Sequence, residues 1–133
     1  MEAVSKYINS PHSPRKMRLL ADIIRGLPVE KALYTLKLHP KKAYAKEMEK
    51  VLLSAIANWQ EKNEELSIEE SGLTVKTITV DGGRVLKRIQ PAPQGRAHRI
   101  RKRYNHITIT VDGLVSETSE VAEVEEISEE TES

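Results

Sequence analysis

The sequence contains no cysteine and no phenylalanine, and it has only one tryptophan and four tyrosines among 133 residues. Without cysteine, disulfide bonds, thiolate metal sites and cysteine nucleophiles are excluded, which suits a reducing compartment. A core must therefore be built mainly from Leu, Ile, Val, Ala and Met side chains. The length predicts one small domain with a modest core.

Long apolar runs are also missing. No segment reaches the roughly 18 apolar residues of a membrane-spanning helix, and the start of the chain, Met1–Lys6, lacks the apolar stretch of a signal peptide. We therefore expect a soluble, cytoplasmic protein without a membrane span. The four histidines are dispersed without metal-ligand spacing, and no glycine-rich phosphate loop is present, so we expect no metal and no other cofactor.

The charges are segregated along the chain. The formal net charge is only +1, from 21 Lys and Arg against 20 Asp and Glu. Residues 112–133 hold nine of these acids and no Lys or Arg, which leaves 11 acids against 21 bases in residues 1–111, a balance of +10. A basic body of this kind points to a polyanionic partner. We expect the acidic tail, 112–133, to be disordered, and we hypothesise that it shields the basic body.

Apolar residues at helical spacing predict three helices. The first begins at Pro14 with Ser13 as its N-cap and ends at Gly26; the second begins at Pro28 and ends before Pro40; the third runs from Lys41 to about Lys62. Trp59 is assigned to the core. The inner stripes comprise Met17, Leu20, Ala21 and Ile24, then Val29, Ala32, Leu33 and Leu36, then Met48, Leu52, Ala55 and Trp59.

Period-two patterns predict strands around Val4–Ile8, Val75–Val80 and His106–Val111. Pairing Val80 with Ile107 and Ile78 with Ile109 implies a long hairpin whose turn is centred between Pro93 and Gln94. The alternative is a tight turn at 81–83 that pairs Val75–Val80 with the segment immediately after it. Both topologies are compatible with the pattern.

In the long-hairpin register, an arm on the order of 40 Å extends from the body. Between Arg84 and Arg103 it carries eight bases and no acid. An isolated two-stranded ribbon is marginal in water, and like charges repel, so this arm requires an anionic partner; a nucleic-acid backbone fits. The alternative is a flexible, solvated basic loop that binds no particular partner. The bases of the arm that could contact such a backbone are Arg84, Lys87, Arg88, Arg96, Arg99, Arg101, Lys102 and Arg103.

Other bases and histidines complete the candidate set. Arg15, Lys16 and Arg18 on the first helix form either a phosphate patch or a solvated face, and Lys41 and Lys42 open the third helix. Arg25 is a further candidate, and His98 and His106 either contact RNA or simply lie on a strand face. Ser13 and Lys16 match a Ser-x-x-Lys nucleophile pattern, but the companion motifs of such hydrolases are absent. We therefore expect no catalytic residues and no enzyme activity.

Three ordered motif groups resemble one family, the universal large-subunit ribosomal protein number twenty-two, of bacterial type. The resemblance covers roughly residues 3–111. Its motifs are Pro14–Gly26 for the first helix, Ser54–Asn58 for the third, and Lys87–Pro91, Gly95–Ala97 and Arg101–Thr108 for the hairpin.

The resemblance implies an α+β fold with three helices on a small three-stranded antiparallel sheet and a long extended β-hairpin arm at about 82–105. It implies a non-enzymatic constituent of the large ribosomal subunit that binds 23S rRNA, supports assembly and contacts neighbouring ribosomal proteins. The hairpin tip, Pro91, Ala92, Pro93, Gln94 and Gly95, would line the nascent-peptide exit tunnel. Asp81–Gly83 would be a bend at the hairpin base. We expect no obligate homo-oligomer.

Two features depart from the family pattern. Many relatives carry bases near the tip, where this chain has Ala92, Pro93 and Gln94. Relatives usually stop soon after the last strand, whereas this chain adds the acidic tail. A free nucleic-acid-binding regulator, with the tail as a mimic of phosphate, is the main alternative to a ribosomal protein.

Overall fold

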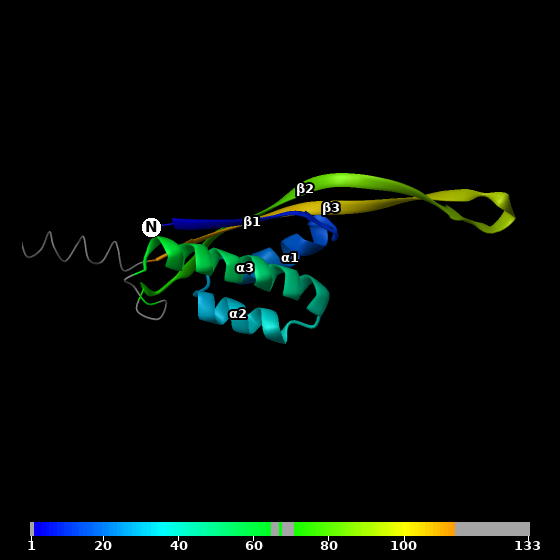
Figure 1. The fold of residues 1–133 in the computed structure, drawn as a ribbon. Helices are drawn as coiled ribbons and strands as arrows, with labels where there is room; N and C mark the ends of the chain where they lie inside the picture. The colour runs from blue at the N-terminus through cyan, green and yellow to red at the C-terminus, as the bar shows by residue number, and fades with distance from the viewer. Residues whose placement is uncertain (1, 65–66, 68–70, 114–133) are drawn as a thin grey trace, which may run out of the picture.

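The computed structural model describes residues 2–64, 67 and 71–113. In this part of the chain, three helices cover one face of a three-stranded antiparallel sheet, so the expected α+β fold is confirmed. Figure 1 shows two of the strands running on together far beyond the helices. The elements in order are β1 (Glu2–Ser10), α1 (Pro14–Ile24), α2 (Val29–Leu38), α3 (Lys42–Lys62), β2 (Thr74–Pro91), the 3₁₀ turn η1 (Pro93–Gly95) and β3 (Ala97–Asp112).

The sheet has the order β1-β3-β2, with β3 in the centre. Ile78 pairs with Ile109 and Val80 pairs with Ile107, as the alternation predicts. The tight turn at 81–83 is wrong, because Gly82 lies within β2 and pairs with Asn105. The two strands therefore form one long hairpin.

A bulge interrupts this hairpin at the base of the arm. The register shifts between Gly82 and Val85, so β2 holds one more residue than β3 at this point. Gly83 lies so close to β3 that a Cβ atom there would be 3.0 Å from the carbonyl carbon and oxygen of Tyr104. A residue without a side chain permits this approach.

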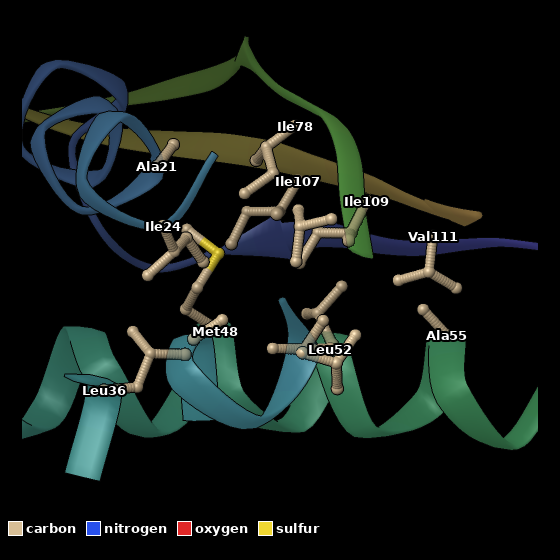
Figure 2. Close-up of a cluster of buried hydrophobic side chains, with 14 of the residues drawn as sticks. Ala21, Ile24, Leu36, Met48, Leu52, Ala55, Ile78, Ile107, Ile109 and Val111 are labelled. Atoms are coloured by element: carbon tan, nitrogen blue, oxygen red, sulfur yellow. The ribbon is translucent and has the colours of Figure 1, made fainter. Parts of the chain in front are cut away.

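The core lies between the helices and the sheet. The predicted stripes of α1 and α3 are buried in full, whereas Leu33 of α2 is only half-buried at the margin. In Figure 2, Met48 and Leu52 of α3 point toward Ile107 and Ile109 of the central strand. Trp59 is 2 % exposed, which confirms its assignment to the core.

The first helix begins where the local sequence predicts, but its expected capping hydrogen bond is absent. Ser13 occupies the N-cap position of α1 and Pro14 is the first helical residue, but the Ser13 side chain makes no capping hydrogen bond. The expected capping role of its hydroxyl is therefore wrong. Gly26 follows the end of α1 with φ +81°, a left-handed conformation that favours glycine.

The acidic tail begins later than its composition suggests. Asp112 is the last residue of β3 and pairs with both Glu2 and Thr74. Gly113 is buried, and the remaining tail, 114–133, lies outside the described residues. Residues 65–66 and 68–70, between α3 and β2, also lie outside them. Of the helices in the described residues, none has the length and apolar character to cross a lipid bilayer.

Candidate nucleic-acid interface

The arm, residues 82–105, is a continuous ladder from the bulge to the tip. Above the bulge its pairs run from Val85 with Arg103 to Pro91 with Ala97. The helices do not reach this part of the hairpin (Figure 1), so it has no core of its own. All eight predicted bases of the arm are exposed.

The tip is a tight turn centred on Gln94. The backbone N–H of Ala92 donates to the carbonyl of Arg96 at 2.7 Å, and Gln94 and Gly95 have φ values of 65° and 70°. The centre is half a residue beyond the predicted point between Pro93 and Gln94. The cause is the bulge, because one extra residue on β2 moves every later pair by one position.

The ladder separates most of the arm's charges from one another. Only Lys87 and Arg101 form a pair of like charges directly opposite each other in the ladder above the bulge. Such pairs are mildly destabilising, whereas a base beside an apolar residue rests its aliphatic stem on it and keeps the charge in water. The bases with apolar partners are Arg103 opposite Val85, Lys102 opposite Leu86, Arg88 opposite Ile100 and Arg99 opposite Ile89.

The arm offers its cations without internal neutralisation. Its sequence contains no acid, and among the described residues no ion pair involves one of its bases. The Arg84 guanidinium instead lies 5.1 Å from the centroid of the Tyr104 ring, a cation–π contact at the arm's base. The charges are therefore available to an external anion.

Where the arm leaves the body, a hollow of about 630 Å³ opens between β3 and the start of α1. We call it the basic groove. It brings together bases from two distant parts of the sequence, which are Arg15 and Lys16 of α1 and Arg101, Lys102 and Arg103 of β3. Of the three bases on the first helix that form either a phosphate patch or a solvated face, Arg15 and Lys16 therefore lie beside the arm and Arg18 does not.

Aromatic rings line the same groove. Tyr44 of α3 contacts the His12 ring, with centroids 4.2 Å apart and an interplanar angle of 41°. The His12 Nε2 atom lies 3.3 Å from an oxygen of Glu47, whose other oxygen accepts a hydrogen bond from the Ser10 hydroxyl at 2.5 Å. Tyr104 lines the groove from β3.

Sequence reasoning did not find these rings. Tyr104 follows Arg101–Arg103 directly, and an aromatic residue inside a basic run is a signal for nucleic-acid binding that was available. His12, three residues before Arg15, carried a weaker form of this signal. Tyr44 carried none, because the bases that share its groove lie on another helix or more than 50 residues away.

Two other residues predicted to contact RNA, Arg18 and Arg25, form hydrogen bonds within the protein. The Arg18 Nε atom donates to the carbonyl of Val80 at 3.1 Å, and an Arg25 guanidinium nitrogen donates to the carbonyl of Ile78 at 2.9 Å. Arg25 also pairs with Asp22 at 2.7 Å. Both arginines thus satisfy backbone acceptors on the outer edge of β2, an edge that would otherwise stay open. Their side chains remain exposed to solvent.

The remaining candidates lie apart from the groove lining. Lys41 and Lys42 are exposed at the start of α3, and His98 is exposed on the arm opposite Gln90. His106 is half-buried, and its Nδ1 atom accepts a hydrogen bond from the backbone N–H of Asn9 at 3.1 Å. Within the described residues, no group of three or more His, Asp or Glu side chains is arranged to hold a metal ion.

Comparisons with known proteins agree on one family. The family model described as Ribosomal protein L22p/L17e matches residues 3–112. Several curated relatives carry the name Large ribosomal subunit protein uL22. The relative from Flavobacterium psychrophilum is 58% identical over 112 residues, which are 84% of this chain and 81% of the relative. That from Christiangramia forsetii is 61% identical over 109 residues, 82% and 80% of the two chains. That from Porphyromonas gingivalis is 58% identical over 110 residues, 83% and 81%.

Proposed function

The chain belongs to the L22p/L17e family of ribosomal proteins, and on that premise we propose that it is a structural, non-enzymatic constituent of the large subunit of the cytoplasmic ribosome. Its partner is the large-subunit ribosomal RNA, together with neighbouring ribosomal proteins. The unit that binds RNA is residues 1–111, including the arm at 82–105.

One observation carries this proposal, namely the projection of an acid-free, exposed basic ladder from a well-packed body. Each phosphate that a base neutralises releases condensed counterions, which favours binding. The arm gains little from packing on its own, because its apolar residues have no core to enter. RNA that surrounds the arm would remove the repulsion between its charges and hold it in one orientation, so that distant RNA segments are joined through one protein.

The tip suits a different neighbour. Pro91 to Gly95 carry no charge, and two prolines restrict the backbone of the turn. A neutral turn held at the end of a long ladder can form part of a wall that a passing polypeptide does not adhere to. We propose that this tip lines the nascent-peptide exit tunnel.

Two other functions have weaker support. A free nucleic-acid-binding regulator would use the same bases, but it gives no reason for an arm that projects beyond its own core. Hydrolysis by Ser13 and Lys16 rests on the Ser-x-x-Lys spacing alone, because the companion motifs of such hydrolases are absent from the sequence.

Replacement of residues 84–103 by a short Asn-Gly turn tests the proposal. The body should stay folded, as the buried Trp59 reports by its fluorescence, because the core lies below the bulge. The protein should be absent from large subunits isolated on sucrose gradients at raised salt, where weak phosphate binding is lost. As a control, Ile89→Ala leaves every arm charge in place and should be incorporated normally. Normal stoichiometry of the shortened protein in the subunit would refute the proposal.

A further inference from the structure

We propose that the basic groove is a pocket for a single unpaired nucleotide of RNA. The nucleobase would lie against the ring of Tyr44, and the adjoining phosphates would contact the Arg and Lys side chains of α1 and β3. This inference rests on the proposed function and names the chemical form of RNA that one part of the interface accepts. The rest of the arm requires only a phosphate backbone.

The dimensions of the groove fit such a ligand. Its volume of about 630 Å³ falls within the roughly 300–1,000 Å³ of pockets that hold small molecules. A duplex cannot enter a hollow of this size, and its bases are stacked on each other. A bulged or looped-out nucleotide presents one free base and two flanking phosphates, which matches a small concave site with cations at its rim.

The rings give the pocket a reason to accept a base as well as a phosphate. Tyr44 and Tyr104 both line the groove and both are half-buried, so part of each ring is accessible from it. Stacking of a nucleobase on an aromatic side chain is favourable and tolerant of sequence, because every base has a π-face. A site for phosphate alone would use only the hydroxyl groups of these residues and not the faces of their rings.

The Tyr44 side of the pocket is already held in place. The His12 ring packs against Tyr44 at a tilt of 41°, and His12 is itself fixed at two points: Glu47 contacts its ring, and the Asn105 side-chain amide donates to its carbonyl at 2.8 Å. Asn105 is fully buried. A ring that is held before the ligand arrives needs less ordering on binding, which strengthens association.

The charge of the groove favours an anion. Five bases line it, and Glu47, the carboxylate that contacts its His12 wall, is engaged by the Ser10 hydroxyl and the His12 ring. Arg15 and Lys16 lie about 85 residues from Arg101–Arg103 in the sequence, so the concentration of charge exists only in the folded protein.

The test uses the full chain and two labelled RNA hairpins of equal length, one with a single bulged nucleotide and one fully paired. Fluorescence anisotropy at moderate salt should give roughly tenfold tighter binding of the bulged hairpin, the size expected from one stacked base. Tyr44→Leu should abolish this preference, and Tyr44→Phe, which keeps the ring, should retain it. Tyr34 of α2 is 67 % exposed and does not line the groove, so Tyr34→Leu is the matched control and should retain the preference.

The outcomes separate the pocket from the proposed function. Equal binding of both hairpins by the wild-type protein, or an unchanged preference in a folded Tyr44→Leu protein, would overturn the pocket even if the protein enters the large subunit normally. If the preference is present but the protein is missing from ribosomes, the ribosomal role fails and the pocket stands. Unchanged thermal unfolding of Tyr44→Leu is the folding control. If this variant unfolds, Tyr44→Met, which also lacks a ring and fits irregular packing, takes its place and should lose the preference.

Discussion

The structure divides the predicted RNA-binding arginines into two groups that one matched pair of variants distinguishes. Arg101 and Arg103 line the basic groove, whereas Arg18 and Arg25 donate to backbone carbonyls on the edge of β2. Arg101→Met with Arg103→Met, and Arg18→Met with Arg25→Met, each remove two positive charges and keep the aliphatic stem. Any general effect of net charge is therefore the same in both double variants.

The groove variant should lose RNA affinity with little loss of stability. Each neutralised phosphate contributes about 0.7–0.9 to the slope of log K against log salt, so two contacts contribute roughly 1.5. At about 0.1 M salt this corresponds to roughly 30-fold weaker binding, or about 2 kcal/mol. Both side chains are exposed and neither forms an ion pair within the described residues, so the free energy of unfolding should change by less than about 0.5 kcal/mol.

The variant at the edge of β2, Arg18→Met with Arg25→Met, should lose stability and keep its RNA affinity. It removes the hydrogen bonds to the carbonyls of Val80 and Ile78, both of which are partly shielded from water. A hydrogen bond from a charged donor is worth about 1.5–3 kcal/mol when buried, and solvent near these exposed arginines reduces this to about 1 kcal/mol each. The pair with Asp22 adds little, because both its members are exposed. We expect a loss of about 2 kcal/mol in stability and an unchanged salt slope.

Two measurements decide between these outcomes. Filter binding to a transcript of the large-subunit ribosomal RNA over a range of salt concentrations gives the slope, and urea unfolding followed by the fluorescence of Trp59 gives the stability. The reasoning is refuted if Arg18→Met with Arg25→Met lowers the slope as much as the groove variant does. It is also refuted if that variant leaves the free energy of unfolding unchanged.

Three further predictions follow from the packing and the charge pattern. Ile109→Ala in the central strand should lower stability by roughly 2–5 kcal/mol, whereas Ile89→Ala on the arm, 73 % exposed, should change it by less than about 0.5 kcal/mol in the same urea experiment. Gly83→Ala should cost about 1–3 kcal/mol because its methyl group meets the Tyr104 backbone; Gly82→Ala, with open space around it, is the control, and equal effects would contradict the close approach. Truncation after Gly113 removes eight glutamates, so binding to unrelated RNA should tighten in filter assays if the tail shields the body, and unchanged affinity would count against shielding.

Much of the body was predictable because buried side chains recur in the sequence at the period of the helix or strand that carries them. Met17, Leu20, Ala21 and Ile24 recur at helical spacing, and all four are buried in the structure. The alternation of Ile78 and Val80 against Ile107 and Ile109 predicted the strand register, because a shift by one residue would move every apolar side chain to the solvent face. The position of the tip was missed by half a residue because the bulge at 83–84 lies where alternation no longer records burial.

The sequence by itself determined the helices, the charge asymmetry and the resemblance to a ribosomal family, because these depend on neighbours along the chain or on motif order. Its apolar alternation left two strand pairings open, and the structure shows the long hairpin. Only the tertiary structure decided what each base does. Arg15, Lys16 and Arg18 are close neighbours in the sequence, yet the rotation of α1 on the sheet sends the first two to the groove and the third to the edge of β2. Likewise Tyr44 and Tyr104 meet at one groove although 60 positions separate them, because contacts between distant segments form only when helices and sheet pack around a common core.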